Sequence, residues 1–145
     1  MRVVHVDVGK WEVRVRRKVV GKLVITRQDT GRYLLSSVEV AEAYWRQGCG
    51  TALMAALARW LYNGQGTSLH ASNEGSGTVQ LLNRAFGSHV KYYGKGRELT
   101  YEEAVHVMDV EFGYTRADVD LETWRVAHPS GCPSISPHVR VKSTK

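Results

Sequence analysis

Apolar and polar residues alternate along the first part of the chain, which is the pattern of half-buried β-strands. The alternation is cleanest where Trp11, Val13 and Val15 fall on one face and charged residues fall on the other. Two polar turns, at 16–18 and 29–31, interrupt it. The pattern therefore predicts an antiparallel meander of strands. These strands are expected at residues 2–8, 11–16, 19–27 and 33–40.

The spacing of apolar residues then changes to one that indicates helices. Leu53, Leu57 and Leu61 share one face of a helix predicted over 51–63, which a glycine follows. Thr100 and Glu103 form the pattern of a capping box that opens another helix. After the first helix we expect a strand at 67–72, a helix at 76–86, a strand at 89–93, a helix at 100–111 and a strand at 114–126.

This order of elements predicts an α/β fold. It consists of a mixed, mostly antiparallel sheet that is flanked by about three helices. The chain has 145 residues, which is long enough for one domain with a real core. We assign residues 1–127 to this domain. Residues 128–145 are expected to form a basic tail, either a loop or an edge strand at 139–141, because prolines and a glycine punctuate them.

Composition and charge narrow the class of protein. No apolar run approaches the length of a membrane span, and the N-terminus lacks the apolar segment of a signal peptide. Cys49 and Cys132 lack metal or redox spacing, so we expect reduced thiols, a cytoplasmic location and no metal site. The net charge of +6 fits either a phosphate-rich partner, including nucleic acid, or simply a soluble basic protein.

Gly48 and Gly50 stand at a junction between a predicted strand and a predicted helix. Glycines allow the backbone to turn tightly and to approach a ligand closely. The helix that follows directs its first N–H groups and the positive end of its dipole at the turn. The junction therefore predicts an anion site that suits a diphosphate, with an ordinary glycine loop as the alternative.

Residues 38–54 resemble the acyl-coenzyme-A-binding motif of the GNAT N-acyltransferase superfamily. Gly48 and Gly50 match its two small positions. Trp45 stands where the family usually has Arg or Gln, which leaves Arg46 or Gln47 to supply that polar contact. The resemblance extends over roughly residues 11–93.

The resemblance continues after the first helix. Residues 69–74 are similar to the family's next strand, which ends in an Asn beside the cofactor, here Asn73. The next helix fits with a short insertion and places Asn83 where the family often has a Tyr that serves as general acid. Only residues 9–10 separate the first two strands, where the family usually has one or two helices. This shortened N-terminal helical cover implies an open acceptor groove, suited to a polymeric acceptor.

The resemblance implies acetyl-coenzyme A or another acyl-coenzyme A as the cosubstrate. The turn residues would hold its diphosphate, the backbone of Val38 and Val40 would pair with its pantetheine arm, and Asn73 would lie beside it. The turn residues are Arg46, Gln47, Gly48, Cys49, Gly50 and Thr51.

Four side chains are candidates for proton transfer. Glu39 precedes the turn and is a candidate general base, with a solvated or salt-bridged strand residue as the equal alternative. His70 is a second candidate, because histidine in general titrates in a suitable range, although a structural role is the commoner one for such a residue. Tyr92, or its neighbour Tyr93, is a candidate donor to the leaving thiolate, with packing as the alternative.

The resemblance implies an N-acyltransferase that moves an acetyl or other acyl group to an amine of a protein or a small molecule. We weigh two alternatives. One is an enzyme that modifies nucleic-acid bases on the same fold, and the other is a non-catalytic acyl-coenzyme-A-binding protein, which Trp45 and Asn83 favour. We expect a monomer or a homodimer with no membrane partner.

Overall fold

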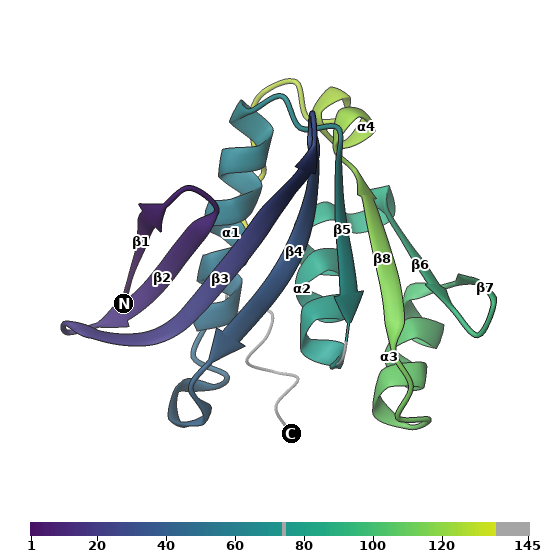
Figure 1. Ribbon diagram of the computed structural model, residues 1–145, viewed down its shortest axis with the longest axis horizontal. Coiled ribbons are helices and arrows are strands. Elements are labelled where there is room, and N and C mark those ends of the chain that lie inside the picture. Colours follow the sequence, from purple (N-terminus) through teal and green to yellow (C-terminus); the bar gives the residue numbers. More distant parts are fainter. Residues whose placement is uncertain (74, 136–145) are drawn as a thin grey trace.

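The computed structural model describes residues 1–73 and 75–135, which form a single sheet with helices packed against it. In these residues the sheet has eight strands in the order β1-β2-β3-β4-β5-β8-β6-β7 (Figure 1). The strands are β1 (Arg2–Asp7), β2 (Lys10–Val15), β3 (Lys18–Asp29), β4 (Arg32–Val40), β5 (Ser68–Asn73), β6 (Val90–Gly94), β7 (Arg97–Leu99) and β8 (Thr115–Asp120). The helices are α1 (Cys49–Asn63), α2 (Ser76–Phe86), α3 (Tyr101–Asp109) and α4 (Leu121–Val126), with short 3-10 turns η1 (Glu42–Tyr44) and η2 (Gly87–His89).

The first four strands form the predicted antiparallel meander. The next pair, β4 and β5, is parallel and is connected through α1. The last strand in sequence, β8, inserts between β5 and β6 and is antiparallel to both. The predicted mixed, mostly antiparallel α/β sheet is therefore confirmed.

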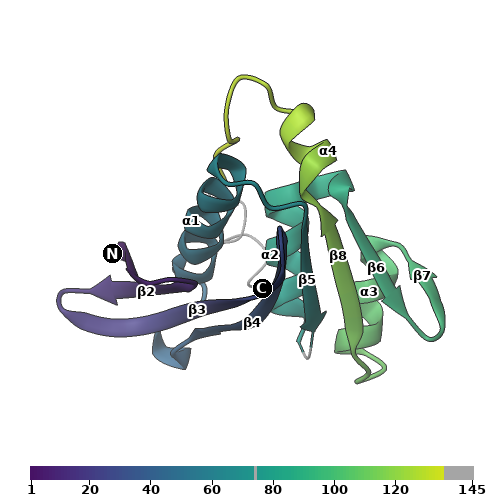
Figure 2. The same ribbon diagram turned by 45° about the horizontal axis from the view of Figure 1, so that its top comes forward.

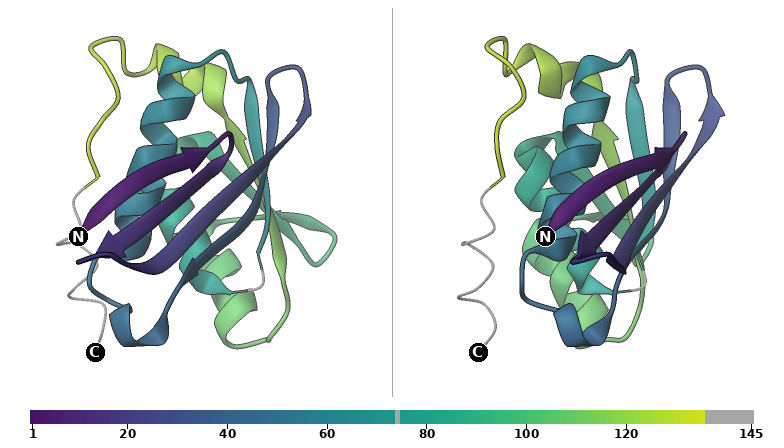
Figure 3. Two further views of the ribbon diagram at one scale, coloured as in Figure 1. Left: turned by 60° about the vertical axis from the view of Figure 1, so that its left-hand side comes forward. Right: turned by 90° about the vertical axis from the view of Figure 1, so that its left-hand side faces the viewer.

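All three longer helices pack against the same face of the sheet, as Figure 3 shows from the side. Trp11, Leu23 and Val38 are aligned across β2, β3 and β4 and lie toward the helices, where Trp11 and Leu23 are buried. The next row, Glu12, Lys22 and Glu39, points to the opposite face because side chains alternate along a strand. We call this opposite face the helix-free face.

The core lies between the sheet and the helices. Leu53, Leu57 and Leu61 of α1 are fully buried, as their helical spacing predicts. At the other end of the layer, Trp124 packs edge-on against Phe86, with their ring centroids 4.8 Å apart. The core thus links α1 and α2 to the C-terminal α4.

The structure corrects the expectation of one strand over 114–126. The strand β8 ends at Asp120, and α4 follows at once. The Asp120 carboxylate accepts hydrogen bonds from the backbone N–H groups of Glu122 and Thr123, both at 3.1 Å, and so caps the helix. The alternating pattern of the sequence continued past the point where this local cap ends the strand.

Three further segments of the chain bear on the expectations from the sequence. The short strand β7, which was not predicted, forms a hairpin with β6. Cys132 and Ile135 follow α4 and pack against the core, in a segment that runs beside α1 (Figure 3). The expected edge strand at 139–141 lies outside the described residues.

Candidate functional site

The two central parallel strands separate partway along their length. Residues 32–35 of β4 pair with residues 68–71 of β5. Beyond these pairs, β4 remains joined to β3 and β5 remains joined to β8. The two strands diverge toward the ends at which α1 and α2 begin (Figures 1 and 2). We call this opening the split, and its apex lies at Leu35 and Ala71.

The edge of β4 in the split presents backbone hydrogen-bonding groups. The N–H of Ala41 donates to the carbonyl of Val20 in β3 at 2.8 Å. Because backbone groups alternate in direction along a strand, Val40 and Val38 direct theirs to the opposite side, into the split. These are the two residues whose backbone is expected to pair with an extended ligand.

The turn after β4 leads directly into the first turn of α1. Gly48 is the N-cap residue and has a φ of 88°, a left-handed conformation that glycine adopts without strain. Because glycine has no side chain, the first N–H groups of α1 receive no side-chain cap from this residue. A Cβ atom at Gly50 would lie 3.3 Å from Leu81 of α2, so a glycine here permits close packing of the two helices.

A guanidinium group lies beside this helix start. Arg84 of α2 donates from Nη1 to the hydroxyl oxygen of Thr51 at 3.2 Å, and Thr51 is buried in the first turn of α1. Within the described residues, Arg84 forms no ion pair with a carboxylate. A half-buried cation next to the positive end of a helix is an arrangement that a bound anion would stabilise.

Asn73 ends β5 on the other side of the split and is 1% exposed. Its Nδ2 donates to the hydroxyl of Thr115 in β8 at 3.2 Å. Its Oδ1 is buried and has no hydrogen-bond partner among the described residues. A buried carbonyl without a partner costs free energy, so this atom marks a place where a ligand donor would bind favourably.

The loop between β4 and α1 uses two of its own side chains. The indole Nε1 of Trp45 donates to the carbonyl of Val40 at 2.6 Å, although the residue is 57% exposed. The amide of Gln47 donates to the carbonyl of Ala43 at 3.2 Å. Trp45 therefore occupies one of the backbone acceptors on the edge of the split, and Gln47 stabilises the loop internally.

Glu39 and His70 share the helix-free face but lie far apart. Glu39 is exposed and stands between Val38 and Val40, beside the open part of the split. His70 stands opposite Leu34, in the part where the strands are still paired. Five residues at about 3.3 Å each place Glu39 roughly 16 Å further along β4 than Leu34. The two side chains therefore cannot act on the same proton.

Both ring nitrogens of His70 have partners. Nδ1 lies 2.7 Å from a carboxylate oxygen of Asp118, and Nε2 lies 3.4 Å from the hydroxyl of Ser68. All three side chains lie on the helix-free face, because Ser68 and His70 are two residues apart on β5 and Asp118 is opposite His70 on β8. The imidazole is thus held within a local polar network.

Tyr92 lies in the core, on the helix-covered face of the sheet. The side chain is 3% exposed, and burial, with a smaller contribution from Tyr101, raises the pKa of its phenol further above 10. Its hydroxyl has no hydrogen-bond partner among the described residues. Tyr93 points to the other face, where the Arg116 guanidinium lies 4.8 Å from its ring centroid. The structure therefore gives Tyr92 no access to the split and places it in the packing role that was its alternative.

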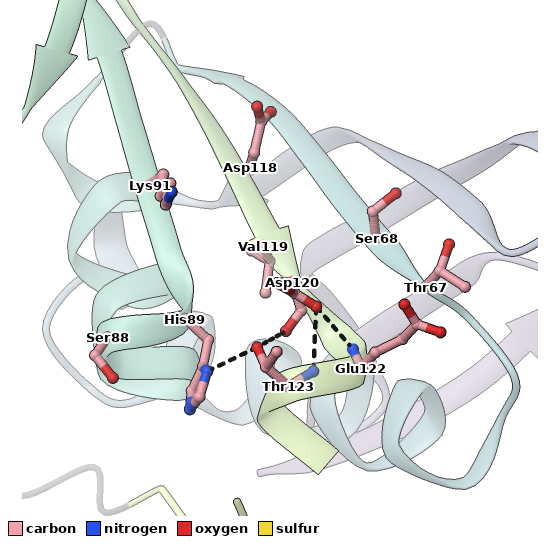
Figure 4. Close-up of a pocket in the computed structure, with 10 residues that line it drawn as sticks. All are labelled: Thr67, Ser68, Ser88, His89, Lys91, Asp118, Val119, Asp120, Glu122 and Thr123. Carbon is pink, nitrogen blue, oxygen red and sulfur yellow. Dashed lines mark hydrogen bonds between the residues drawn. The ribbon is translucent and has the colours of Figure 1, made fainter. Parts of the chain in front are cut away.

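A pocket of about 460 Å³ opens near the beginning of α4, away from the split. Figure 4 shows Ser68 and Asp118 at this pocket, on neighbouring strands. Asp120 takes part in its wall while it caps α4 (Figure 4). In residues 1–73 and 75–135, no group of three or more His, Cys, Asp and Glu side chains is arranged to hold a metal ion.

Sequence reasoning missed Arg84, Ser68 and Asp118 as members of these polar clusters. The spacing of Ser68 and His70 was a usable signal, because residues two apart on a strand share a face. Asp118 could not be predicted in this way, because its place beside His70 depends on the insertion of β8 between β5 and β6. Arg84 reaches Thr51 only through the packing of α2 on α1.

Comparisons with known proteins agree with this geometry. The model of the acetyltransferase (GNAT) family matches residues 6–87, more than half of the chain. No curated protein is significantly similar to the chain in sequence. In the described part of the chain, no helix is long and apolar enough to cross a membrane.

Solved structures with a similar fold include two that are named as N-acetyltransferases and one that was solved with CoA. The ribosomal-protein-S18-alanine N-acetyltransferase of Escherichia coli has a TM-score of 0.53 at 16% identity, over 77% of this chain and 68% of that one. The ribosomal-protein-alanine N-acetyltransferase of Brucella melitensis has a TM-score of 0.54 at 17% identity, over 77% and 67%. A Mycobacterium tuberculosis protein solved in complex with CoA has a TM-score of 0.53 at 16% identity, over 77% and 75%.

These identities establish likeness of fold, and the family match covers the meander from the end of β1, the split, the glycine turn and both helices that begin beside it. The chain belongs to the GNAT acetyltransferase family.

Proposed function

We propose that this protein is an acyl-coenzyme-A-dependent N-acyltransferase that uses the split as its cosubstrate site. The observation that carries the proposal is the separation of β4 from β5 toward the end of the sheet at which α1 and α2 begin (Figures 1 and 2). Acyl-coenzyme A supplies an acyl thioester, and the most direct choice is acetyl-coenzyme A.

The residues present fit such a ligand at both ends of the split. The turn at Gly48 and the first turn of α1 offer N–H groups to a diphosphate, and Arg84 adds a positive charge. The backbone of Val38, with the N–H of Val40, binds an extended amide-bearing arm as a neighbouring strand would. Oδ1 of Asn73, which has no hydrogen-bond partner among the described residues, accepts a hydrogen bond from the same arm.

Glu39 is the proposed base for the acceptor amine. It stands between Val38 and Val40, so its carboxylate projects onto the helix-free face directly beside the ligand-binding edge. A carboxylate there takes the proton of an amine directly or through water as the amine attacks the thioester carbonyl. We do not assign this role to His70, whose two ring nitrogens already bind Asp118 and Ser68.

The acceptor approaches from the helix-free face, and we propose that it is a protein amine. No described helix covers this face, which leaves room for a peptide or a folded protein beside Glu39 (Figure 3). The E. coli and B. melitensis neighbours are named for transfer to alanine of ribosomal proteins, which supports an acceptor of this class. A cytoplasmic location goes with this function and with the free thiols of Cys49 and Cys132.

Isothermal titration with acetyl-coenzyme A tests the binding step. We expect saturable binding with one site per chain, weaker binding for Arg84→Met, and much weaker binding of pantetheine, which lacks the diphosphate. Arg97→Met is a matched control, because Arg97 is an exposed arginine on β7. Absence of binding to the wild-type protein would contradict the proposal.

Acetyl transfer to a peptide library and to small polyamines tests the reaction. We expect Glu39→Gln to reduce kcat by roughly 10²-fold while acetyl-coenzyme A binding is unchanged. Binding with no turnover of any amine would identify the non-catalytic alternative, which the Trp45–Val40 contact favours. Strongly salt-dependent binding of DNA or RNA would instead favour the nucleic-acid alternative.

A further inference from the structure

Ser68, His70 and Asp118 form a connected set on the helix-free face. The Ser68 hydroxyl lies 3.4 Å from Nε2 of His70, and Nδ1 of the same ring lies 2.7 Å from Asp118. The side chains of His70 and Asp118 are 24% and 30% exposed, so the pair is partly shielded from water and still accessible. A hydroxyl, an imidazole and a carboxylate in this order are the parts of an activated serine.

Charged groups around His70 support one tautomer. Asp118 is the acceptor for Nδ1–H, which leaves the lone pair of Nε2 directed at Ser68. Arg116 lies 3.6 Å from the same Asp118 carboxylate, and Lys91 stands opposite Asp118 on β6. Leu34 on the β4 side is apolar. These cations attract the Asp118 carboxylate, and its hydrogen bond with Nδ1 holds the ring in this orientation.

The set also opens onto a cavity. Ser68 and Asp118 both line the pocket of about 460 Å³ near α4, and Figure 4 shows them on neighbouring strands of its wall. The volume is sufficient for a small acyl ester. The pocket is separate from the split, because Ser68 lies in the paired part of β5, on the far side of His70 from the apex.

We propose that Ser68 is a nucleophile that accepts an acyl group from a small ester or thioester in this pocket. The Ser68 oxygen attacks the acyl carbon as its proton passes to Nε2 of His70. The bond from the acyl carbon to the leaving oxygen or sulfur then breaks, and His70 returns the proton to the leaving group. The products are an acyl ester on Ser68 and a free alcohol or thiol.

The position of Ser68 within a hydrogen-bonded strand predicts a single acylation and not rapid turnover. The backbone N–H of Ser68 donates to the carbonyl of Gly31 at 3.2 Å, so it is not available to stabilise an oxyanion. A serine with a base but without such a donor lacks a large part of the stabilisation that fast hydrolysis needs. The measurable result is therefore a stable covalent adduct.

The experiment uses p-nitrophenyl acetate with the full chain, read out by p-nitrophenolate release and by peptide mapping with mass spectrometry. We expect one acetyl group on Ser68 in the wild-type protein and none at this position in Ser68→Ala. His70→Gln should slow labelling of Ser68 by roughly 10²-fold, and Asp118→Asn by about tenfold or more. Ser72→Ala is the matched control, on the same strand and the same face, and should leave the rate unchanged.

Two outcomes would overturn the proposal: labelling of Ser68 no faster than that of Ser72, or equal labelling of Ser68 in His70→Gln. Ser68→Cys keeps a nucleophile at this position and should remain labelled, which separates loss of the nucleophile from loss of folding. The probe requires no coenzyme A. A failure here is therefore distinct from a failure of acetyl-coenzyme A binding.

Discussion

Single residues determine the shape of the turn between β4 and α1. Gly48 adopts a φ of 88°, and Arg46 adopts a φ of 67° despite its side chain. A left-handed conformation is unfavourable for residues other than glycine, so such positions are often maintained by a function. The backbone direction at Gly48 decides where the first N–H groups of α1 point.

Gly48→Ala is expected to reduce both stability and ligand binding. An alanine at this φ costs about 1–2 kcal/mol, and relaxation of the turn would redirect the N–H groups that we propose bind the diphosphate. Chemical denaturation and titration with acetyl-coenzyme A measure the two effects. Gly96→Ala is the control, because Gly96 has a φ of 76° with open space around it, and it lies on the β6–β7 turn. Gly96→Ala should lose a similar amount of stability without a change in affinity for acetyl-coenzyme A. An equal loss of affinity in both variants would contradict this interpretation of the turn.

Tyr92→Phe tests the packing role of the buried tyrosine. The hydroxyl is buried without a partner among the described residues, so its removal should raise the free energy of unfolding by about 1 kcal/mol. Acetyl transfer should be unchanged, since the ring lies on the helix-covered face. Thermal melting and a transfer assay check the two expectations. A large loss of kcat at unchanged stability would return Tyr92 to the list of proton donors.

At the scale of elements, caps decide where helices begin. The hydroxyl of Thr100 accepts from the N–H of Glu103 at 3.1 Å, and the Glu103 carboxylate accepts from the N–H of Thr100 at 2.9 Å. This is the capping box that the sequence predicts for α3. The cap at Asp120 has no such signature, which is why the strand was expected to continue.

The stability of α3 is expected to depend on pH through Glu103. The hydrogen bond from Arg97 and, next, that from the Thr100 backbone lower the pKa of the Glu103 carboxyl from 4.5 to about 2. A lowered pKa in the folded state means that the ionised form stabilises the protein above pH 4.5, and that this contribution is lost as the pH falls toward 2. The wild-type protein should therefore have a higher melting temperature than Glu103→Gln near neutral pH, and the two melting temperatures should converge in acid.

Melting temperatures at several pH values measure this convergence. Glu98→Gln is a suitable control, because Glu98 lies on β7 next to Arg97 and makes no carboxylate ion pair among the described residues. A difference between wild type and Glu103→Gln that is constant with pH would show that the charge of Glu103 contributes nothing.

At the scale of the whole molecule, the longer helices pack on one face of the sheet, and the helix-free face stays open to binding partners. The split is the one place in the described sheet where neighbouring strands in the order lose their pairing before both end. A ligand there would bridge β4 and β5 and so connect the meander to the second half of the sheet.

Acetyl-coenzyme A is therefore expected to stabilise the entire fold. A ligand that binds only the native state raises the free energy of unfolding by about 2.7 kcal/mol at a concentration of 100 times Kd. The melting temperature should rise with ligand concentration in the wild type and rise much less in Gly48→Ala. A melting temperature that does not respond to saturating ligand would contradict binding to the native state.

Local patterns were sufficient for most of the fold. Alternation predicted the meander, helical spacing predicted α1 and α2, and the capping box predicted α3, because each depends on neighbours within a few residues. The glycines at 48 and 50 and the family resemblance also located the turn and the strand before it. The sequence by itself therefore determined the family, most of the order of the elements and the place of the candidate cosubstrate site, but neither β7 nor α4.

Tertiary structure decided what long-range packing brings together. Placement of β8 between β5 and β6 put Asp118 beside His70, and packing of α2 on α1 put Arg84 beside Thr51. The same packing turned Tyr92 into the core and left Glu39 exposed beside the split. These contacts join residues 33 to 48 positions apart, and no local period encodes them, because they depend on the order of strands in the sheet and on how the helices dock.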